Sequence, residues 1–218
     1  MQDDQKQRER LLDAVLPHVM FDGWSETAMK AAAKDLGEDP FVFEMYFPGG
    51  PVDLVSFFIE RADDFMEEEL IKRDVLSMKI RERITLAVRL RLEMYIPYRE
   101  EVRKALTLLA MPQNAGRAMK LTAGTVSRMW YATGDTSTDF NYYTKRLTLS
   151  AVYSSTFLYW LDDQSDDFHK TWEFLDRRIA NVMQFETAKF KAKSFLSKKP
   201  KGPDLFSFDR FRRHLKTR

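Results

Sequence analysis

The feature that most limits the possible folds of this chain is the helical spacing of its apolar residues, which continues along almost all of its 218 positions. Alternating runs of Val, Ile and Thr between hairpin turns, the pattern typical of strands, are missing. The sequence therefore predicts an all-α fold.

The first fifty residues contain three helical segments separated by glycine. An apolar stripe over residues 11–19 predicts a first helix that ends near Gly23. Ser25 is suited to cap a second helix, which Gly37 ends, and Asp39 begins a short third one. Three short helices with a glycine turn between the second and the third resemble a helix-turn-helix.

Longer apolar stripes follow in the rest of the chain. They predict helices over residues 52–72, 80–95, 102–111, 121–130, 142–160 and 168–185. In the first of these helices, the residues expected to face inward are Leu54, Phe57, Phe58, Ala62, Phe65 and Leu70.

Composition excludes several kinds of site. Without cysteine, the chain has no disulfide framework, thiolate metal site or Cys nucleophile. None of its three histidines follows a glutamate by three residues, so a paired Glu-x-x-His di-metal site has no support. The polar, acidic N-terminus and the absence of an apolar run of about 18 residues predict a protein made and kept in a cytoplasm.

Charge is divided unevenly along the chain. Residues 189–218 carry eleven basic and two acidic side chains, a net charge of +9. Residues 1–188 carry 24 basic and 31 acidic side chains, a net charge of −7. We therefore expect different partners for an acidic body and a cationic tail.

A motif near the N-terminus carries a first family resemblance. It reads Phe21-x-Gly23-Trp24-x-x-Thr27-Ala28-Met29 and is followed by Gly37 and by Tyr46-Phe47. These positions resemble the N-terminal domain of the TetR family of regulators. Residues 1–50, however, hold five basic and ten acidic side chains, and the expected recognition helix offers Glu38, Asp39 and Glu44. Because cations supply most non-specific affinity for DNA, we expect no nucleic-acid partner.

Four further motifs lie between residues 90 and 146. They are the run Leu90-Arg91-Leu92-Glu93-Met94-Tyr95-Ile96-Pro97-Tyr98, then Met111-Pro112-Gln113-Asn114, Met129-Trp130-Tyr131, and Asp135-x-Ser137-Thr138-Asp139-Phe140-Asn141-x-Tyr143-Thr144-x-Arg146. Together they strongly resemble the coenzyme Q protein 9 family, and the similarity extends from about Leu11 to about Lys189.

This resemblance implies a TetR-like homodimer that has lost DNA binding and holds an isoprenoid lipid, such as a quinone precursor, with no cofactor and no catalysis of its own. It also implies a partner, the demethoxyubiquinone hydroxylase, to which the lipid is presented. The family's partner-facing patch corresponds here to Met129, Asp139, Tyr142 and Tyr143, with Tyr142 in place of the Trp that the family often has.

Flat and flexible side chains could line a pocket for a long apolar ligand, and the chain has eleven Met and 29 aromatic residues. From the residues alone, an ordinary core is the favoured interpretation of these side chains, and the family resemblance reverses this in favour of a ligand cavity. The predicted lipid-binding residues are Ile84, Val88, Leu92, Leu108, Met111, Trp130, Tyr153, Phe157 and Trp172.

The C-terminal tail predicts a membrane contact. After a linker over residues 198–203, apolar and basic side chains recur at helical spacing. A short basic amphipathic helix with aromatic residues is typical of segments that bind anionic membranes, whereas a disordered basic tail would contact any polyanion. The predicted membrane-binding residues are Leu205, Phe208, Phe211, Leu215, Arg210, Arg213 and Lys216.

These expectations define three parts: a degenerate helix-turn-helix at 1–50, a lipid-binding helical part at 51–188, and a basic tail at 189–218. The predicted function is that of a lipid-binding accessory protein of ubiquinone biosynthesis. It would lie on the inner membrane of a bacterium, or on the matrix side of the mitochondrial membrane. The alternative is a TetR-type transcriptional regulator with a hydrophobic ligand.

Overall fold

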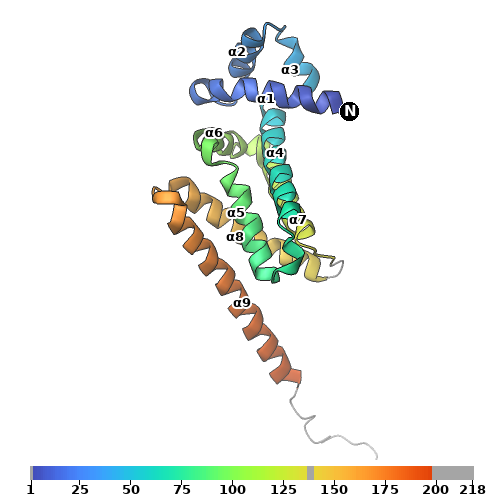
Figure 1. Cartoon of the computed structure of the whole chain (residues 1–218), viewed down its shortest axis with the longest axis vertical. Helices are drawn as coiled ribbons and strands as arrows, with labels where there is room; N and C mark the ends of the chain where they lie inside the picture. Colours follow the sequence, from blue (N-terminus) through green and yellow to red (C-terminus); the bar gives the residue numbers. More distant parts are fainter. Residues whose placement is uncertain (1, 137–139, 198–218) are drawn as a thin grey trace, which may run out of the picture. The chain divides into compact units, whose positions relative to one another are not determined.

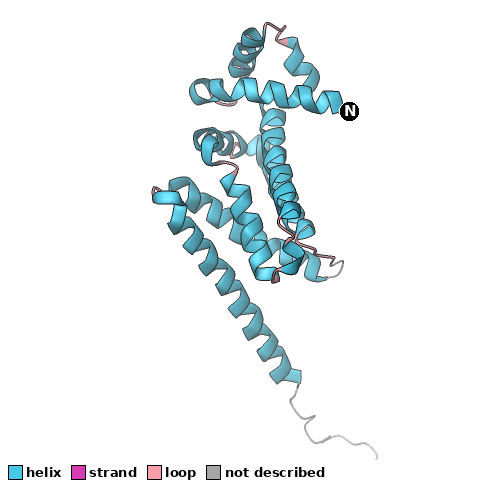
Figure 2. Ribbon diagram, viewed as in Figure 1, coloured by secondary structure: helices cyan, strands magenta, loops and turns pink. Residues whose placement is uncertain are grey.

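The computed structural model describes residues 2–136 and 140–197, with the side chains of residues 3–136 and 142–184. Within these residues every regular element is a helix, which confirms the predicted all-α class (Figure 2). The α-helices are α1 (Gln2–Asp22), α2 (Glu26–Leu36), α3 (Phe41–Tyr46), α4 (Pro51–Lys72), α5 (Ile80–Glu93), α6 (Arg99–Leu109), α7 (Ala115–Ala132), α8 (Phe140–Asp162) and α9 (His169–Ser197). Short 3-10 helices lie at Val75–Ser77, Ile96–Tyr98, Pro112–Asn114 and Asp166–Phe168.

The first three helices form a small layer in which α2 and α3 pack against α1 (Figure 1). As predicted, Ser25 caps α2, and its Oγ accepts a hydrogen bond from the backbone N–H of Ala28 at 3.2 Å. Gly37 ends the same helix with φ at +69°, a conformation in which a side chain is strained. Trp24 joins this layer to α6, because its indole Nε1 donates to the carbonyl of Glu101 at 2.8 Å in a buried setting.

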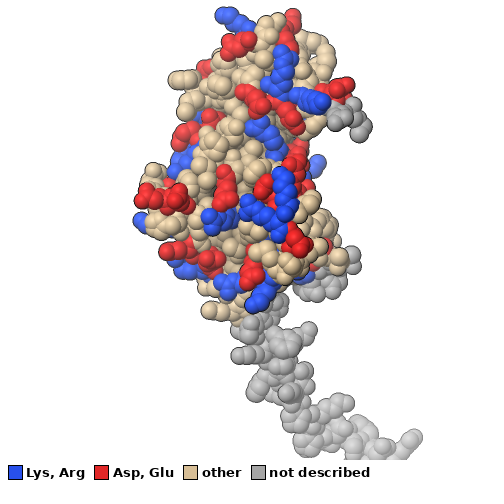
Figure 3. Space-filling view, in the orientation of Figure 1, with Lys and Arg blue, Asp and Glu red and all other residues tan. Residues whose placement is uncertain are grey.

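Below this layer in the view of Figure 1, α4 packs along α5 and α7, and α7 packs along α8. Five helices, α4 to α8, thus surround a common interior. Ion pairs reinforce the outside of the α4–α7 contact, where Arg128 binds both Asp64 and Glu67. On the face drawn in Figure 3, acidic and basic side chains are interspersed over this part of the chain.

The inward face of α4 differs from the prediction at one position. Phe65 is 38% exposed, whereas its neighbour Met66 is fully buried. Met66 continues the i, i+4 row of Leu54, Phe58 and Ala62, and Phe65 lies 100° to one side of that row. The periodicity therefore identified the helix, but the aromatic character of Phe65 was a poor guide to its burial.

Asp163 organises the junction between α8 and α9. Its carboxylate accepts hydrogen bonds from the backbone N–H and hydroxyl of Ser165, and from the backbone N–H and hydroxyl of Thr171. The bond from the backbone N–H of Thr171 satisfies a donor in the first turn of α9 that has no partner within the helix.

The chain divides into two compact units, Met1–Ile179 and Ala180–Arg218. Of the second unit, the structure describes the continuation of α9 to Ser197. The predicted border between residues 188 and 189 thus falls inside a helix.

Candidate ligand-binding cavity

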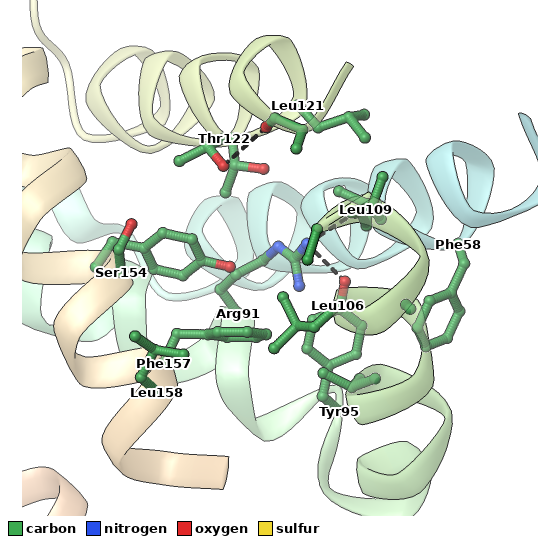
Figure 4. A pocket seen from close by; sticks show the side chains of 17 residues that line it. Phe58, Arg91, Tyr95, Leu106, Leu109, Leu121, Thr122, Ser154, Phe157 and Leu158 are labelled. Atoms are coloured by element: carbon green, nitrogen blue, oxygen red, sulfur yellow. Dashed lines mark hydrogen bonds between the residues drawn. The ribbon is translucent and has the colours of Figure 1, made fainter. Parts of the chain in front are cut away.

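A cavity of about 290 Å³ lies among α4, α5, α6, α7 and α8 (Figure 4). Most of its wall is apolar: α6 contributes four aliphatic side chains, and the rings of Phe58, Tyr95 and Phe157 form part of the remainder. Two lining residues, Ala110 and Leu158, are exposed to solvent, so the cavity reaches the surface there. The aliphatic residues from α6 are Val102, Ala105, Leu106 and Leu109.

One charged side chain lines this apolar cavity. Arg91 of α5 is 1% exposed and forms an ion pair with Asp63 of α4, its Nε donating to Oδ1 at 2.5 Å. Thr125 of α7 donates its hydroxyl to the other carboxylate oxygen at 2.9 Å. Three helices are thereby joined at one buried polar cluster, which we define as Asp63, Arg91, Tyr95 and Thr125.

Tyr95 completes this cluster just beyond the end of α5. Arg91 Nη2 donates to the Tyr95 hydroxyl at 2.8 Å and to the carbonyl of Ile59 at 3.1 Å. The guanidinium carbon also lies 4.4 Å from the centre of the Tyr95 ring. Tyr95 follows Arg91 by four residues and keeps a helical backbone conformation, so the two side chains lie on the same face.

The polar cluster has a defined protonation state at neutral pH. Burial raises the pKa of Tyr95 above its usual value, and it likewise raises the pKa of Tyr153 on the facing helix α8. Burial opposes the charge of Arg91, but its neighbours Tyr95, Tyr153 and Asp63 raise the pKa of Arg91 overall. The guanidinium therefore stays charged, and both phenols keep their protons and can donate hydrogen bonds.

One nitrogen of Arg91 is not used by the protein. Nη1 is buried and makes no hydrogen bond to any residue in the described part of the chain. A guanidinium has five N–H donors, of which Nη1 carries two. A buried donor without a partner costs about 1–3 kcal/mol, and more when the group is charged. Figure 4 shows this guanidinium group in the cavity lining, joined by a hydrogen bond to the Tyr95 hydroxyl.

The structure places only two of the nine predicted lipid-binding residues in this lining, Tyr153 and Phe157. The other seven lie elsewhere in the described structure. Ile84, Val88 and Leu92 are buried on α5, and Met111 is exposed. Leu108, Trp130 and Trp172 are partly buried. A direct role of these seven in ligand binding stays a prediction that this cavity does not support.

Sequence reasoning missed the polar cluster, although one signal was present. The apolar stripe of α5 runs through Ile84, Val88 and Tyr95, and Arg91 occupies the same face, three residues after Val88 and four before Tyr95. A charged residue on a buried stripe requires a buried partner, and Asp63 is on the inward face of the predicted helix 52–72. The pairing of the two could not be deduced without the helix packing.

The predicted partner-facing residues lie in different environments. Met129 is fully buried, Tyr142 is half-buried and Tyr143 is 70% exposed. Tyr142 lies under the guanidinium of Arg146 at 3.4 Å and edge-on to Tyr143. Asp139 lies outside the described residues, as do all the predicted membrane-binding residues of the tail.

Two further properties concern the described part of the chain as a whole. No group of three or more His, Asp or Glu side chains within it could hold a metal ion. None of its helices is both long and apolar enough to cross a membrane.

Comparison with known proteins gives the family context of this cavity. The COQ9 family model matches residues 115–186. The chain is 35% identical over 187 residues to "Ubiquinone biosynthesis protein COQ9-B, mitochondrial" of Xenopus laevis, covering 83% of this chain and 64% of that protein. It is 36% identical over 189 residues to the COQ9 protein of Rattus norvegicus, covering 84% and 61%, and 33% identical over 194 residues to that of Homo sapiens, covering 85% and 61%. The chain thus spans less than two thirds of the length of these curated relatives.

A solved structure confirms the fold. The crystal structure of the TetR transcriptional regulator from Nitrosomonas europaea ATCC 19718 superimposes with a TM-score of 0.69 and covers 81% of this chain and 98% of its own. Sequence identity is 20%, so the similarity establishes a TetR-like fold and nothing about activity.

Proposed function

We propose that this protein is a lipid-binding accessory protein of ubiquinone biosynthesis, because residues 115–186 match the COQ9 family model and the similarity to COQ9 proteins extends over most of the chain. In this proposal it binds an isoprenoid quinone intermediate at the membrane and presents it to the demethoxyubiquinone hydroxylase. It acts as a homodimer and catalyses no reaction itself.

The observation that carries the proposal is the apolar cavity among α4 to α8. Small-molecule sites are mostly apolar clefts with a few polar groups that fix orientation, and this cavity has that composition. Its volume of about 290 Å³ is near the lower end of the range of roughly 300–1,000 Å³ for such sites. A ring and a few isoprene carbons fit this space, and a longer chain would leave through the opening near Ala110 and Leu158.

The test is extraction of the purified protein with organic solvent and mass spectrometry of the extract, after expression in a quinone-producing host. Ala118 of α7 lines the cavity, whereas Ala123 on the same helix is exposed. Ala118→Phe should reduce the bound isoprenoid by filling the space, and the matched control Ala123→Phe should leave it unchanged. A wild-type protein that carries no isoprenoid quinone or precursor contradicts the proposal.

The proposed membrane contact depends on the tail. Removing residues 200–218 should abolish co-sedimentation with anionic liposomes, because each cation near the headgroups contributes roughly 1 kcal/mol. Replacing Leu205, Phe208, Phe211 and Leu215 by Ala keeps every charge of the tail. If this variant still co-sediments as the wild type does, the tail acts by charge alone and the amphipathic helix is refuted.

The TetR-like fold favours a second candidate, a transcriptional regulator with a hydrophobic ligand. Its weakness is electrostatic, since α3 contains Glu44 and no Lys or Arg, and it exposes Phe41 and Met45. Under this second hypothesis the protein should shift an operator fragment at moderate salt. Under the lipid-binding hypothesis, in contrast, reversing the charges of Glu38, Asp39 and Glu44 should alter lipid binding little.

A further inference from the structure

We propose that the cavity recognises an uncharged oxygen acceptor on its ligand through the free Nη1 of Arg91, so that a quinone ring enters first and its isoprenoid chain points to the opening. This inference rests on the proposed function, and it adds which chemical group is recognised and in which orientation.

The first argument is the unused donor. Arg91 is almost completely buried, and its Nε and Nη2 are held by Asp63, Tyr95 and the Ile59 carbonyl. These contacts fix the guanidinium plane, so Nη1 is positioned without a partner among the described residues. Buried polar groups are nearly always hydrogen-bonded, and a fixed donor on a cavity wall is suited to a ligand oxygen.

The second argument concerns the charge of that oxygen. Asp63 already balances the charge of Arg91, and Thr125 donates to the same carboxylate. An anionic head such as a carboxylate or phosphate would leave one negative charge uncompensated in the apolar cavity, which is strongly unfavourable. A carbonyl oxygen can accept from Nη1 without changing the net charge of the site.

The third argument concerns orientation. The rings of Tyr95 and Phe157 pack edge to face with their centres 6.4 Å apart, and both line the cavity next to the guanidinium, where they offer aromatic surface to a ring (Figure 4). Tyr153, which keeps its proton, also lines the cavity and is a second donor for a ring substituent. The lining residues that reach solvent, Ala110 and Leu158, are apolar and suit the chain rather than the head.

The experiment compares three probes of similar apolar character by equilibrium dialysis: ubiquinone with two isoprene units, the oxygen-free hydrocarbon farnesene, and oleate. The test variant is Arg91→Met combined with Asp63→Leu, because exchanging a buried ion pair for apolar residues of similar size is often tolerated. Thr107→Val on α6 is the matched control, since the exposed Thr107 hydroxyl is bonded to the Arg103 carbonyl of its own helix and Thr107 does not line the cavity.

We expect the wild type to bind the ubiquinone more tightly than either other probe. The double variant should lose about 10- to 100-fold in ubiquinone affinity, the effect of one charged hydrogen bond, and should bind farnesene as before. Thr107→Val should change neither. Equal ubiquinone affinity in the folded double variant, or preference of the wild type for oleate, overturns the inference while leaving lipid binding intact. A wild type that binds no probe defeats the proposed function itself.

A measurement on the wild type covers the case in which the double variant does not fold. The infrared carbonyl stretch of the bound ubiquinone should shift to lower frequency than that of the same molecule in hydrocarbon, because a hydrogen bond from a cation weakens the C=O bond. An unshifted band from bound ubiquinone refutes the contact with Arg91.

Discussion

Replacing Asp163 by Asn should destabilise the junction between α8 and α9 in a way that depends on pH. The carboxylate is buried and accepts four hydrogen bonds, at 2.8 and 2.6 Å from Ser165 and at 2.9 and 2.6 Å from Thr171. Two of these donors are backbone N–H groups and two are hydroxyls. The amide of Asn has one acceptor oxygen, so it cannot replace the ionised carboxylate in all four bonds.

The size of the effect follows from the pKa. Burial by itself would raise the pKa of Asp163, but the hydrogen bonds from Ser165 and Thr171 outweigh it and lower the pKa to about 2. An unfolded Asp has a pKa near 3.9, so the folded state favours the ionised form by about 2–3 kcal/mol. This stabilisation is fully present above the unfolded pKa and is lost as the pH falls towards the folded pKa, with about half gone at pH 3.

The assay is urea unfolding of wild type and Asp163→Asn at pH 7 and at pH 3, followed by circular dichroism. The expected difference in unfolding free energy is about 2–3 kcal/mol at pH 7 and about half of that at pH 3. The neighbouring Asp162→Asn is the control, because its exposed side chain contacts Arg103 at 3.5 Å and such surface pairs contribute little. A loss that is the same at both pH values, or no larger than that of the control, refutes the reasoning.

Three further substitutions test the rest of the structure by urea or thermal unfolding. Asp63→Asn should cost about 3–5 kcal/mol because it leaves the buried charge of Arg91 uncompensated, and a cost below 1 kcal/mol contradicts the ion pair. Trp24→Phe should cost about 1–3 kcal/mol by leaving the Glu101 carbonyl without its indole donor, and an unchanged midpoint argues against this link. Gly37→Ala should cost about 1–2 kcal/mol because φ is +69° there, and a stabilised variant would show that α2 ends differently.

Local rules predicted the helices well because their causes are local. Ser25 and Gly37 delimit α2 through a cap and a left-handed residue, both visible in the sequence. Proline marks the interruption after α5, where the predicted end at residue 95 lies two residues beyond the observed Glu93. The burial of Met66 in place of Phe65 depends on where neighbouring helices lie, and periodicity alone could not decide between adjacent positions.

The site was less predictable because it is made by contacts between helices far apart in the sequence. Asp63 and Arg91 are 28 residues apart, and Thr125 is 62 residues from Asp63. Their flat or apolar character makes residues such as Leu92 candidates for a pocket lining, yet Leu92 fills the core. Composition identifies residues that can line a cavity, whereas the packing of five helices decides which of them do.

The polar cluster also links ligand binding to the stability of the helical body. The Arg91–Asp63 pair joins α5 to α4, Thr125 adds α7, and Tyr153 faces the same cavity from α8. A ligand oxygen that satisfies Nη1 removes the cost of a buried donor from the folded state only, since that donor is solvated when the chain is unfolded. Ligand binding should therefore raise the unfolding midpoint. Once the free ligand concentration exceeds the dissociation constant, the added unfolding free energy should grow with the logarithm of the ratio of the two. Because release of the ligand exposes this cost again, the proposed delivery to a hydroxylase would be favoured by an acceptor site that binds the ring at least as well as Arg91 does.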